Sequence, residues 1–518
     1  MTLSAAVRGV LHTALTAYRD QPRTVELLRH QLARLDEPLR VAIAGKVKAG
    51  KSTLLNALVG EGVAPTDAGE CTKVVTWYRN GRSPRIVMYP SAGAPTPLPV
   101  VRRDGTLEID LAGTPADAID RLVVDWPAQS LRATTLIDTP GVASINADVS
   151  RRTVRFLEPD CDNPTDNPTD TPTEADAVIY LMRHLHVTDL DFLESFRDQG
   201  VARATSVNTV AVISRADEIG GGRLDAMYAA RAIATRYRSE PALRGLCQNV
   251  VAVAGLLAHT GRTLRQNEFV ALSELAAAPR DDLERSLLSV DRFLRDAPEV
   301  RLGLVHRFGL YGIHLATSLL RQGTRTPTAL ADELVARSGL TELQQVLQVQ
   351  FAGRQDLLKA RSALLALDRI VRADGDARGL GTQVERLLAG AHEFAELRLL
   401  GALRSGTVAL PGPLAHEAER LLGGPDIQRL GLPEGASPEE VRRAALSALR
   451  RWQGQSENPM FGRRVADACR LIARTCEGIL SRTQLNRVGA PSVYLPGGTT
   501  AHLPIAVEGE VSWRNPAR

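Results

Sequence analysis

One turn of eight residues constrains the fold of this chain more than any other feature. The range Gly45–Ser52 reads GKVKAGKS, a full GxxxxGK[ST] pattern, and it follows the apolar run RVAIA at 40–44. A helical pattern begins at Ser52. Between a strand and a helix this pattern is typical of a phosphate-binding loop, because its glycines let backbone N–H groups turn inward around an anion. We name Gly45–Ser52 the phosphate loop and expect an α/β domain around it.

The side chains of the phosphate loop predict binding of a triphosphate and magnesium. Lys51 would place its ammonium on the β- and γ-phosphate oxygens, and the Ser52 hydroxyl would ligate Mg²⁺. The chain has only five lysines among its 63 basic residues, and Lys46, Lys48 and Lys51 all lie in this loop. Since an ammonium is a compact charge and a guanidinium a planar fork, this clustering indicates a specialised site. The other positions expected to contact the nucleotide are Gly45, Lys48, Ala49, Gly50 and Thr53.

A second motif adds a sensor for the terminal phosphate. The range Leu136–Gly141 reads LIDTPG, the end of an apolar strand followed by DxxG. Asp138 would hold Mg²⁺ through water, and the Gly141 N–H would meet the γ-phosphate. We therefore expect Ser52 and Asp138 to hold the metal together.

A third motif selects the base. The range Val210–Asp217 reads VAVISRAD, a buried strand that ends in a variant of the [NT]KxD guanine signature. Asp217 can accept hydrogen bonds from the N1–H and 2-amino groups of guanine, both of which adenine lacks, so an adenine would leave the carboxylate unpaired. Arg215 would lie along the ring face, while Ser214 departs from the usual Asn or Thr and leaves the rigidity of the loop open. Ala254, after the strand pattern at 250–253, fits the last guanine loop. GTP or GDP with Mg²⁺ is the expected ligand.

Composition and charge exclude several other classes of protein. The net charge of +4 over 518 residues is no footprint for nucleic acid. The five cysteines are scattered without metal-site spacing, which favours a reducing cytosol over a disulfide framework. The N-terminal segment is interrupted by Arg8 and His12, so it is a poor signal peptide, and no run of 18 apolar residues predicts a membrane span. Any membrane contact is expected to be peripheral.

Hydrophobic patterns divide the chain into two kinds of structure. Alternating strands and helices up to residue 260 predict a P-loop domain with a mostly parallel sheet, and the helical periodicity that follows predicts an elongated all-α bundle or stalk. The expected further strands are Val74–Tyr78, Ile86–Tyr89, Leu122–Trp126, Thr134–Ile137, Ala177–Met182, Thr209–Ile213 and Val250–Val253. The expected domains are an N-terminal helix at 1–36 that joins the bundle, a nucleotide domain at 37–260 with a DNPT-repeat insertion at 160–175, a bundle at 261–486 and a flexible tail at 487–518.

These motifs, in this order, resemble the dynamin-superfamily GTPases. The segments APTDAGECTKVVTW, SRADEIGGGRLDAM and LLSVDRF look closest to the mycobacterial isoniazid-inducible dynamin-like proteins. The resemblance implies that Thr72, with Thr66 as fallback, contacts Mg²⁺ and the γ-phosphate in the first switch. It also implies GTP hydrolysis, face-to-face pairing of nucleotide domains, a related dynamin-like partner, and remodelling of anionic membrane lipid. The implied location is cytoplasmic, peripherally associated with the inner face of the plasma membrane.

The resemblance leaves one catalytic position to be filled. Val142 stands where Ras-like enzymes place a water-orienting glutamine, and a valine cannot position water. Lys48 occupies the phosphate-loop position whose Ser or Asn in many relatives helps to bind a monovalent cation. We hypothesise that the Lys48 ammonium replaces that cation and acts with Lys51, Thr72 and Gly141 as catalytic machinery. The alternative is a solvated lysine on the rim of the loop.

Two other functions compete with this interpretation. An RNA- or ribosome-associated GTPase should carry a GxxG loop or a basic stripe with aromatics, and the helical half shows neither. A weakly hydrolysing GTP-binding scaffold acting with a partner is disfavoured because Lys51, Ser52, Thr72 and Asp138 are all intact.

Three apolar features in the helical half have both a structural and a functional interpretation. The run 308–320 is expected to be a buried bundle helix rather than a membrane paddle. The segment 408–414 is a turn or an apolar tip that touches lipid. Cys469 and Cys476 lie seven residues apart on one helix face and are expected in a core.

Overall fold

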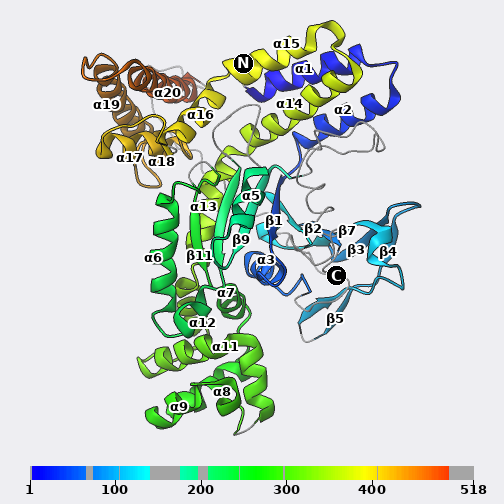
Figure 1. Ribbon diagram of the computed structural model, residues 1–518, viewed down its shortest axis with the longest axis vertical. Helices are drawn as coiled ribbons and strands as arrows, with labels where there is room; N and C mark the ends of the chain where they lie inside the picture. Colours follow the sequence, from blue (N-terminus) through cyan, green and yellow to red (C-terminus); the bar gives the residue numbers. More distant parts are fainter. Residues whose placement is uncertain are drawn as a thin grey trace, which may run out of the picture.

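The structure of the protein is a computed structural model. It describes residues 3–65, 74–103, 105–140, 175–195, 208–243, 246–295, 298–404 and 406–488. A central sheet lies in the middle of the molecule, with helical groups extending from it in different directions (Figure 1). The DNPT repeats at 162–173 and the tail from 489 onward lie outside the described residues.

The central sheet has nine strands in the order β11-β10-β9-β1-β8-β2-β7-β3-β4. All pairs from β11 to β8 are parallel, and so is β2 with β7, whereas β2–β8, β3–β7 and β3–β4 are antiparallel. The strands are β1 (Leu39–Gly45), β2 (Val75–Asn80), β3 (Arg85–Pro90), β4 (Thr96–Leu98), β7 (Ile119–Trp126), β8 (Thr134–Asp138), β9 (Ala177–Met182), β10 (Thr209–Ser214) and β11 (Val250–Val253). The expected α/β domain and its strands are confirmed.

Three short strands were not predicted. They are β4 and the two-stranded ribbon of β5 (Val101–Arg103) and β6 (Thr106–Glu108). Each is three residues long, so none offers enough residues for an alternating apolar pattern.

Helices cover both faces of the parallel part of the sheet. The helices that follow its strands are α3 (Lys51–Val59), α5 (Val187–Ser195), α6 (Ala226–Ser239) and α7 (Gly255–Arg262). Alternate residues of one strand face two different cores: Val41 and Ile43 face the core that holds α3, and Ala42 and Ala44 face the core that holds α6. Because β1, β9 and β10 are buried on both faces, their sequences read as continuous apolar runs.

The helices from 266 to 350 pack against the nucleotide domain. They are α8 (Gln266–Ala277), α9 (Arg280–Ser286), α10 (Val290–Phe293), α11 (Pro298–Arg321), α12 (Pro327–Arg337) and α13 (Leu340–Gln350). Phe308 and Ile313 of α11 are buried in the same core as β9 and β10, so the apolar run at 308–320 is buried as expected, but against the sheet. Gly339 shows how close the packing is, because a Cβ there would lie 2.1 Å from the Ala252 carbonyl oxygen of β11.

A separate helical group, which we name the N-terminal arm, combines two helices that precede the nucleotide domain in the sequence with two that follow it. It consists of α1 (Leu3–Ala17), α2 (Pro22–Arg34), α14 (Gln355–Asp374) and α15 (Leu380–Gly390), which share one hydrophobic core. The expectation of one continuous helix over 1–36 is wrong. Pro22 occupies the first turn of α2, where its missing N–H and fixed φ suit a helix start, and the chain turns at 18–21.

The last helices form a second group, which we name the C-terminal bundle. They are α16 (His392–Arg404), α17 (Gly412–Leu421), α18 (Asp426–Arg429), α19 (Pro438–Ser456) and α20 (Arg463–Val488). The sequence SPEE at Ser437–Glu440 predicts a capping box, and the structure confirms it: the Ser437 hydroxyl accepts from the Glu440 N–H, while the Glu440 carboxylate accepts from the Ser437 N–H. Cys469 and Cys476 are buried in this core as expected.

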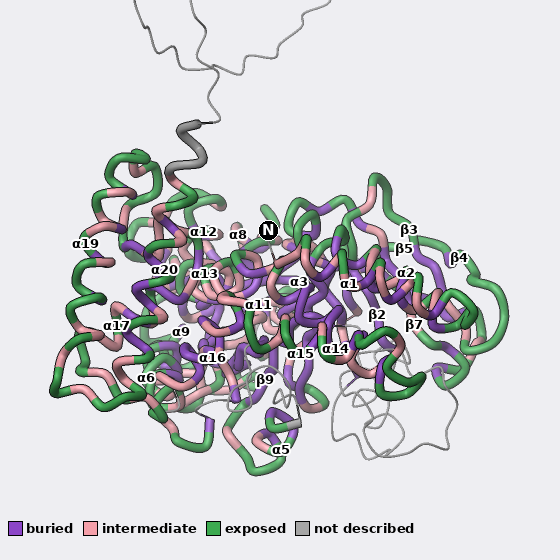
Figure 2. Tube along the Cα trace, turned by 90° about the horizontal axis from the view of Figure 1, so that it is seen from above, coloured by how far each residue is buried: buried purple, intermediate pink, exposed green. Residues whose placement is uncertain are grey.

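Apolar side chains of the segment 408–414 pack on the C-terminal bundle. Val408, Leu410 and Leu414 all contact its core, which favours the turn interpretation over a lipid-touching tip. Figure 2 shows α19 at one side of the molecule, with exposed residues along its outer surface. Within the described ranges, no helix combines the length and apolarity that a membrane span requires.

Candidate functional site

The phosphate loop needs glycine at two places for different reasons. Gly45 has φ 147°, and a Cβ at this position would lie 2.4 Å from the Leu181 carbonyl oxygen of β9. Gly50 adopts the left-handed conformation (φ 89°) at the N-cap of α3, where a glycine has no steric penalty. Lys48 is the unusual member, because it holds φ 62° without being glycine.

Lys51 lies folded over the loop. Its Nζ donates to the carbonyl oxygens of Gly45 at 3.2 Å and Lys46 at 3.3 Å. Burial lowers the pKa of Lys51, and the nearby Asp138 carboxylate opposes that shift. An ammonium held by two weak acceptors in a buried position is ready to exchange them for phosphate oxygens.

Ser52 and Asp138 meet across the start of α3 and the end of β8. The Ser52 hydroxyl donates to Asp138 Oδ2 at 2.8 Å. The other carboxylate oxygen, Oδ1, is buried with no hydrogen-bond partner among the residues that the structure describes, and burial raises the pKa of Asp138. Next to them, Thr139 fixes the turn, since its hydroxyl and N–H both donate to the Ile43 carbonyl oxygen.

These oxygens fit a hard divalent cation. Mg²⁺ prefers hydroxyl and carboxylate oxygens and keeps several water ligands, so a hydroxyl beside an unpartnered carboxylate oxygen matches what one or two protein ligands supply. No group of three or more His, Cys, Asp or Glu with metal-site geometry occurs among the residues that the structure describes. The hydroxyl and carboxylate present here fit a Mg²⁺ that takes its remaining ligands from water or from a bound group.

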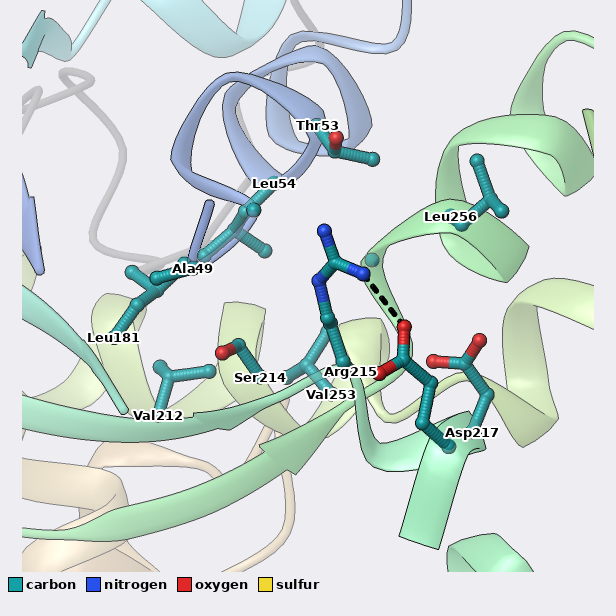
Figure 3. A pocket seen from close by; sticks show the side chains of 13 residues that line it. Ala49, Thr53, Leu54, Leu181, Val212, Ser214, Arg215, Asp217, Val253 and Leu256 are labelled. Carbon is teal, nitrogen blue, oxygen red and sulfur yellow. Dashed lines mark hydrogen bonds and ion pairs between the residues drawn. The ribbon is translucent and has the colours of Figure 1, made fainter. Parts of the chain in front are cut away.

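One pocket joins the phosphate loop to the predicted base motif. It encloses ≈ 580 Å³, counting space open to solvent, and is lined by Ala49 and Gly50 at one side and by Asp217 at the other. Thr53 and Leu54 of α3 face Arg215 across it (Figure 3). Burial raises the pKa of Asp217, with the neighbouring Glu218 adding to the shift. A planar ring lying in this pocket would meet a carboxylate at its edge.

The base motif is held by contacts that sequence reasoning missed. We name Ser214–Glu218 the base loop. The Ser214 hydroxyl donates to the Met182 carbonyl oxygen at 3.2 Å, and Arg215, at φ 50°, donates from Nη1 to Glu218 Oε1 at 2.7 Å. The dashed line in Figure 3 marks this second contact. The predicted residue Ala254 is buried behind the pocket, its N–H donating to the Ser338 carbonyl oxygen at 2.9 Å.

A buried carboxylate also holds the phosphate loop from behind. Asp189, at the start of α5, is 1% exposed and contacts Lys46 Nζ at 3.0 Å. Asp189 further accepts from the Tyr180 hydroxyl at 2.7 Å and from the His186 N–H at 3.0 Å. Sequence spacing gave no signal for this contact, because Lys46 and Asp189 are far apart in the chain.

The remaining predicted site residues divide into two groups. Lys48 is exposed, and no contact of its side chain with another described residue is found. Thr72, Thr66, Gly141 and Val142 lie outside the described residues. The structure therefore brings together the phosphate loop, Asp138 and the base loop.

Comparison with known proteins decides the family. A family model described as the dynamin family matches residues 41–189. The isoniazid-induced protein IniC of Mycobacterium tuberculosis is 41% identical over 505 residues, which cover 94% of this chain and 100% of the relative. This chain belongs to the dynamin family. Dynamin-family proteins are GTPases, so this dynamin-family chain is a GTP hydrolase.

More distant relatives match only part of the dynamin-family chain. The bacterial dynamin-like protein of Nostoc punctiforme is 31% identical over 123 residues, 21% of this chain and 17% of that protein. The dynamin-like protein A of Bacillus subtilis is 24% identical over 194 residues, 37% of this chain and 15% of that protein. A solved structure of an oligomerised bacterial dynamin pair covers 94% of this chain and 75% of that chain, with 13% identity and a TM-score of 0.30.

Proposed function

We propose that this GTPase binds GTP with Mg²⁺ in the pocket between the phosphate loop and the base loop. It then couples hydrolysis to movement of the N-terminal arm and C-terminal bundle. The observation that carries the proposal is the single pocket with Ala49 and Gly50 at one side and Asp217 at the other. Lys51 and Ser52 belong to that phosphate loop and Asp138 contacts Ser52, so triphosphate and base determinants would face one ligand.

Each residue of the site has a distinct task in this proposal. Lys51 exchanges its two carbonyl contacts for the β- and γ-phosphate oxygens, and Ser52 and Asp138 hold the metal. Bound Mg²⁺ neutralises charge that develops between the β- and γ-phosphates. Thr72 and Gly141, proposed from the motifs, complete the contacts to the γ-phosphate. Asp217 selects guanine, and Arg215 lies along the face of the base.

Lys48 is the proposed cationic catalyst. Its backbone is left-handed (φ 62°), and its exposed side chain makes no contact with another described residue. A cation so placed can stabilise charge growing on the bridging oxygen where relatives use a monovalent ion. We expect Lys48→Ala to lose hydrolysis in potassium-free buffer while GTP binding persists. Unchanged hydrolysis under those conditions would remove Lys48 from the mechanism.

Family membership supports a proposal for the cellular role. The proposal is that nucleotide domains pair face to face, with another copy or a related dynamin-like protein, and that the helical parts act on anionic lipid. The protein would work at the cytoplasmic side, peripherally attached to the inner face of the plasma membrane, and would remodel or maintain it. Family membership also favours this role over that of an RNA-associated GTPase.

The nucleotide proposal can be tested by substituting Asp217 and changing the base of the nucleotide. In Asp217→Asn, the amide presents a donor where guanine also has donors, so GTP affinity should fall by about 10- to 100-fold, the range for losing a charge-assisted hydrogen bond. The same amide complements the additional carbonyl of xanthine, so xanthosine triphosphate should bind better than GTP. Calorimetry with both nucleotides measures this, with Lys51→Ala as a control that weakens both. Equal affinity of the wild-type protein for GTP and ATP would refute guanine selection, and GTP turnover with and without anionic liposomes tests the membrane role.

A further inference from the structure

The base loop is attached to the end of β9 by two contacts. Ser214 donates to the carbonyl oxygen of Met182, the last residue of β9. The next residue, Arg183, forms an ion pair with Glu218 at the far end of the base loop. Ser214 replaces the Asn or Thr that the motif usually carries. In this protein, the two contacts attach the base loop to the end of β9.

Glu218 stands between two guanidinium groups. Its Oε2 contacts Arg183, and its Oε1 accepts from Arg215 Nη1 at 2.7 Å. Arg183 directly follows β9 and Arg215 directly follows β10, so one carboxylate connects the ends of two neighbouring strands. Both Arg215 and Glu218 line the pocket, with Asp217 between them in sequence.

The orientation of Arg215 depends on this carboxylate. An arginine side chain is long and has several rotatable bonds, so an unheld guanidinium would sample many positions in the pocket. Glu218 instead fixes one end of the guanidinium plane, which Figure 3 shows extending across the pocket toward Thr53 and Leu54. A planar cation held edge-on in this way presents its face to an aromatic ring beside it.

We propose that Glu218 is a positioning residue for nucleotide binding: braced by Arg183, it holds the Arg215 guanidinium flat as the stacking wall for the base. The inference rests on the proposed binding of guanine in this pocket. Glu218 itself does not read the identity of the base, because its two oxygens are engaged by arginines. Its contribution is therefore to affinity for any purine, while Asp217 determines which purine is preferred.

The first experiment measures how Glu218→Gln changes binding and turnover. The two bridges are half-exposed, so their loss together with a disordered Arg215 should weaken GTP binding by about three- to tenfold. KM should rise by a similar factor while kcat stays within about twofold, because the lost interaction is made equally with substrate and transition state. Inosine triphosphate, which lacks the 2-amino group, should lose affinity by the same factor as GTP. Inorganic triphosphate, which has no base, should bind as it does to the wild-type protein.

A double-mutant cycle tests whether Glu218 acts through Arg215. In an Arg215→Ala background, Glu218→Gln should cause less than about 1.5-fold further loss, since coupled residues are not additive. Arg183→Gln should reproduce part of the loss in the wild-type background and none of it in Glu218→Gln. Glu218→Asp, which keeps the charge on a shorter side chain, serves as the conservative variant and should recover part of the affinity.

Besides unchanged GTP binding by Glu218→Gln, three outcomes overturn the proposal. They are an additive cycle, a loss confined to kcat, or a change in the ratio of GTP to inosine triphosphate affinity, which would show that Glu218 acts on recognition by Asp217. If the wild-type protein prefers GTP to ATP but Glu218→Gln binds GTP as tightly as the wild-type protein does, only this inference fails. If wild-type protein shows no preference for guanine, the proposed function fails first. Thermal unfolding without nucleotide checks that each variant is folded.

Discussion

The joint between the N-terminal arm and the nucleotide domain depends on a buried ion pair. Arg34, the last residue of α2, contacts Asp176 at 2.7 Å, and their side chains are 5% and 2% exposed. Asp176 immediately precedes β9, and its other oxygen accepts from the Arg40 N–H of β1 at 3.0 Å. Nearby, the Lys359 ammonium of α14 donates to the carbonyl oxygens of Leu35 at 2.8 Å and Glu37 at 3.1 Å. Because Arg34 and Asp176 are buried away from water, each charge is compensated by the other.

Replacing Arg34 with methionine removes the charge and keeps most of the volume. Asp176 would then keep a single N–H donor in a buried position. Removing one partner of a buried pair costs about 3–5 kcal/mol, because the remaining charge is left uncompensated. At about 2–4 °C per kcal/mol for a domain of this size, the first unfolding transition should fall by about 6–20 °C. Scanning fluorimetry without nucleotide measures this transition.

Two further variants make the prediction sharp. Arg8 pairs with Asp36 in the same arm, but the two side chains are 34% and 71% exposed, so Arg8→Met should cost less than about 1 kcal/mol. The double variant Arg34→Met/Asp176→Asn removes both buried charges, keeps an acceptor for the Arg40 N–H and should recover most of the lost stability. If Arg34→Met destabilises no more than Arg8→Met, the argument from burial is refuted.

The remaining predictions concern the nucleotide site and the cysteines. Gly45→Ala would place a Cβ against a β9 carbonyl oxygen, so calorimetry should detect no GTP binding, whereas Gly303→Ala, with open space around it, should bind normally. Burial raises the pKa of Asp138, so its neutral form contributes stability that is lost as pH rises through that raised pKa. Asp138→Asn should therefore be the more stable protein at neutral pH in chelator, yet lose magnesium-dependent hydrolysis; lower stability than wild type in chelator would contradict this. Burial raises the pKa of Cys476 to about 12, so iodoacetamide at pH 8 should modify the half-buried Cys247 and spare Cys476, as peptide mass spectrometry would show.

Sequence reasoning succeeded where the determinant is local. The capping box at Ser437 and the strand–turn–helix context of the phosphate loop are satisfied by neighbouring residues, so short patterns predict them. The break before Pro22 was also local, but the apolar spacing on both sides of it resembles one continuous helix. Periodicity indicates that a helix has a buried face and does not identify what covers that face. For this reason the packing of α11 on the sheet could not be predicted.

The motifs of the candidate site were predictable from the sequence, whereas the contacts that hold those motifs in place were not. Lys51, Ser52, Asp138 and Asp217 could be proposed as site residues because each lies at a fixed position in a known pattern. Asp189 contacts Lys46 and Glu218 contacts Arg183, and each pair is distant in the chain. A single carboxylate in a sequence does not indicate which residue it will contact. Such contacts become visible only when the topology places β9 beside β1 and β10.

Because the chain uses arginine far more often than lysine, few of its side chains can react with an amine-specific reagent. Only five side chains carry a primary amine, and three of them, Lys46, Lys48 and Lys51, lie in the phosphate loop. Lys359 is shielded in the joint, at 7% exposure. Of the four lysines that the structure describes, three therefore stand in the proposed nucleotide site, so bound GTP should protect them from an acylating reagent.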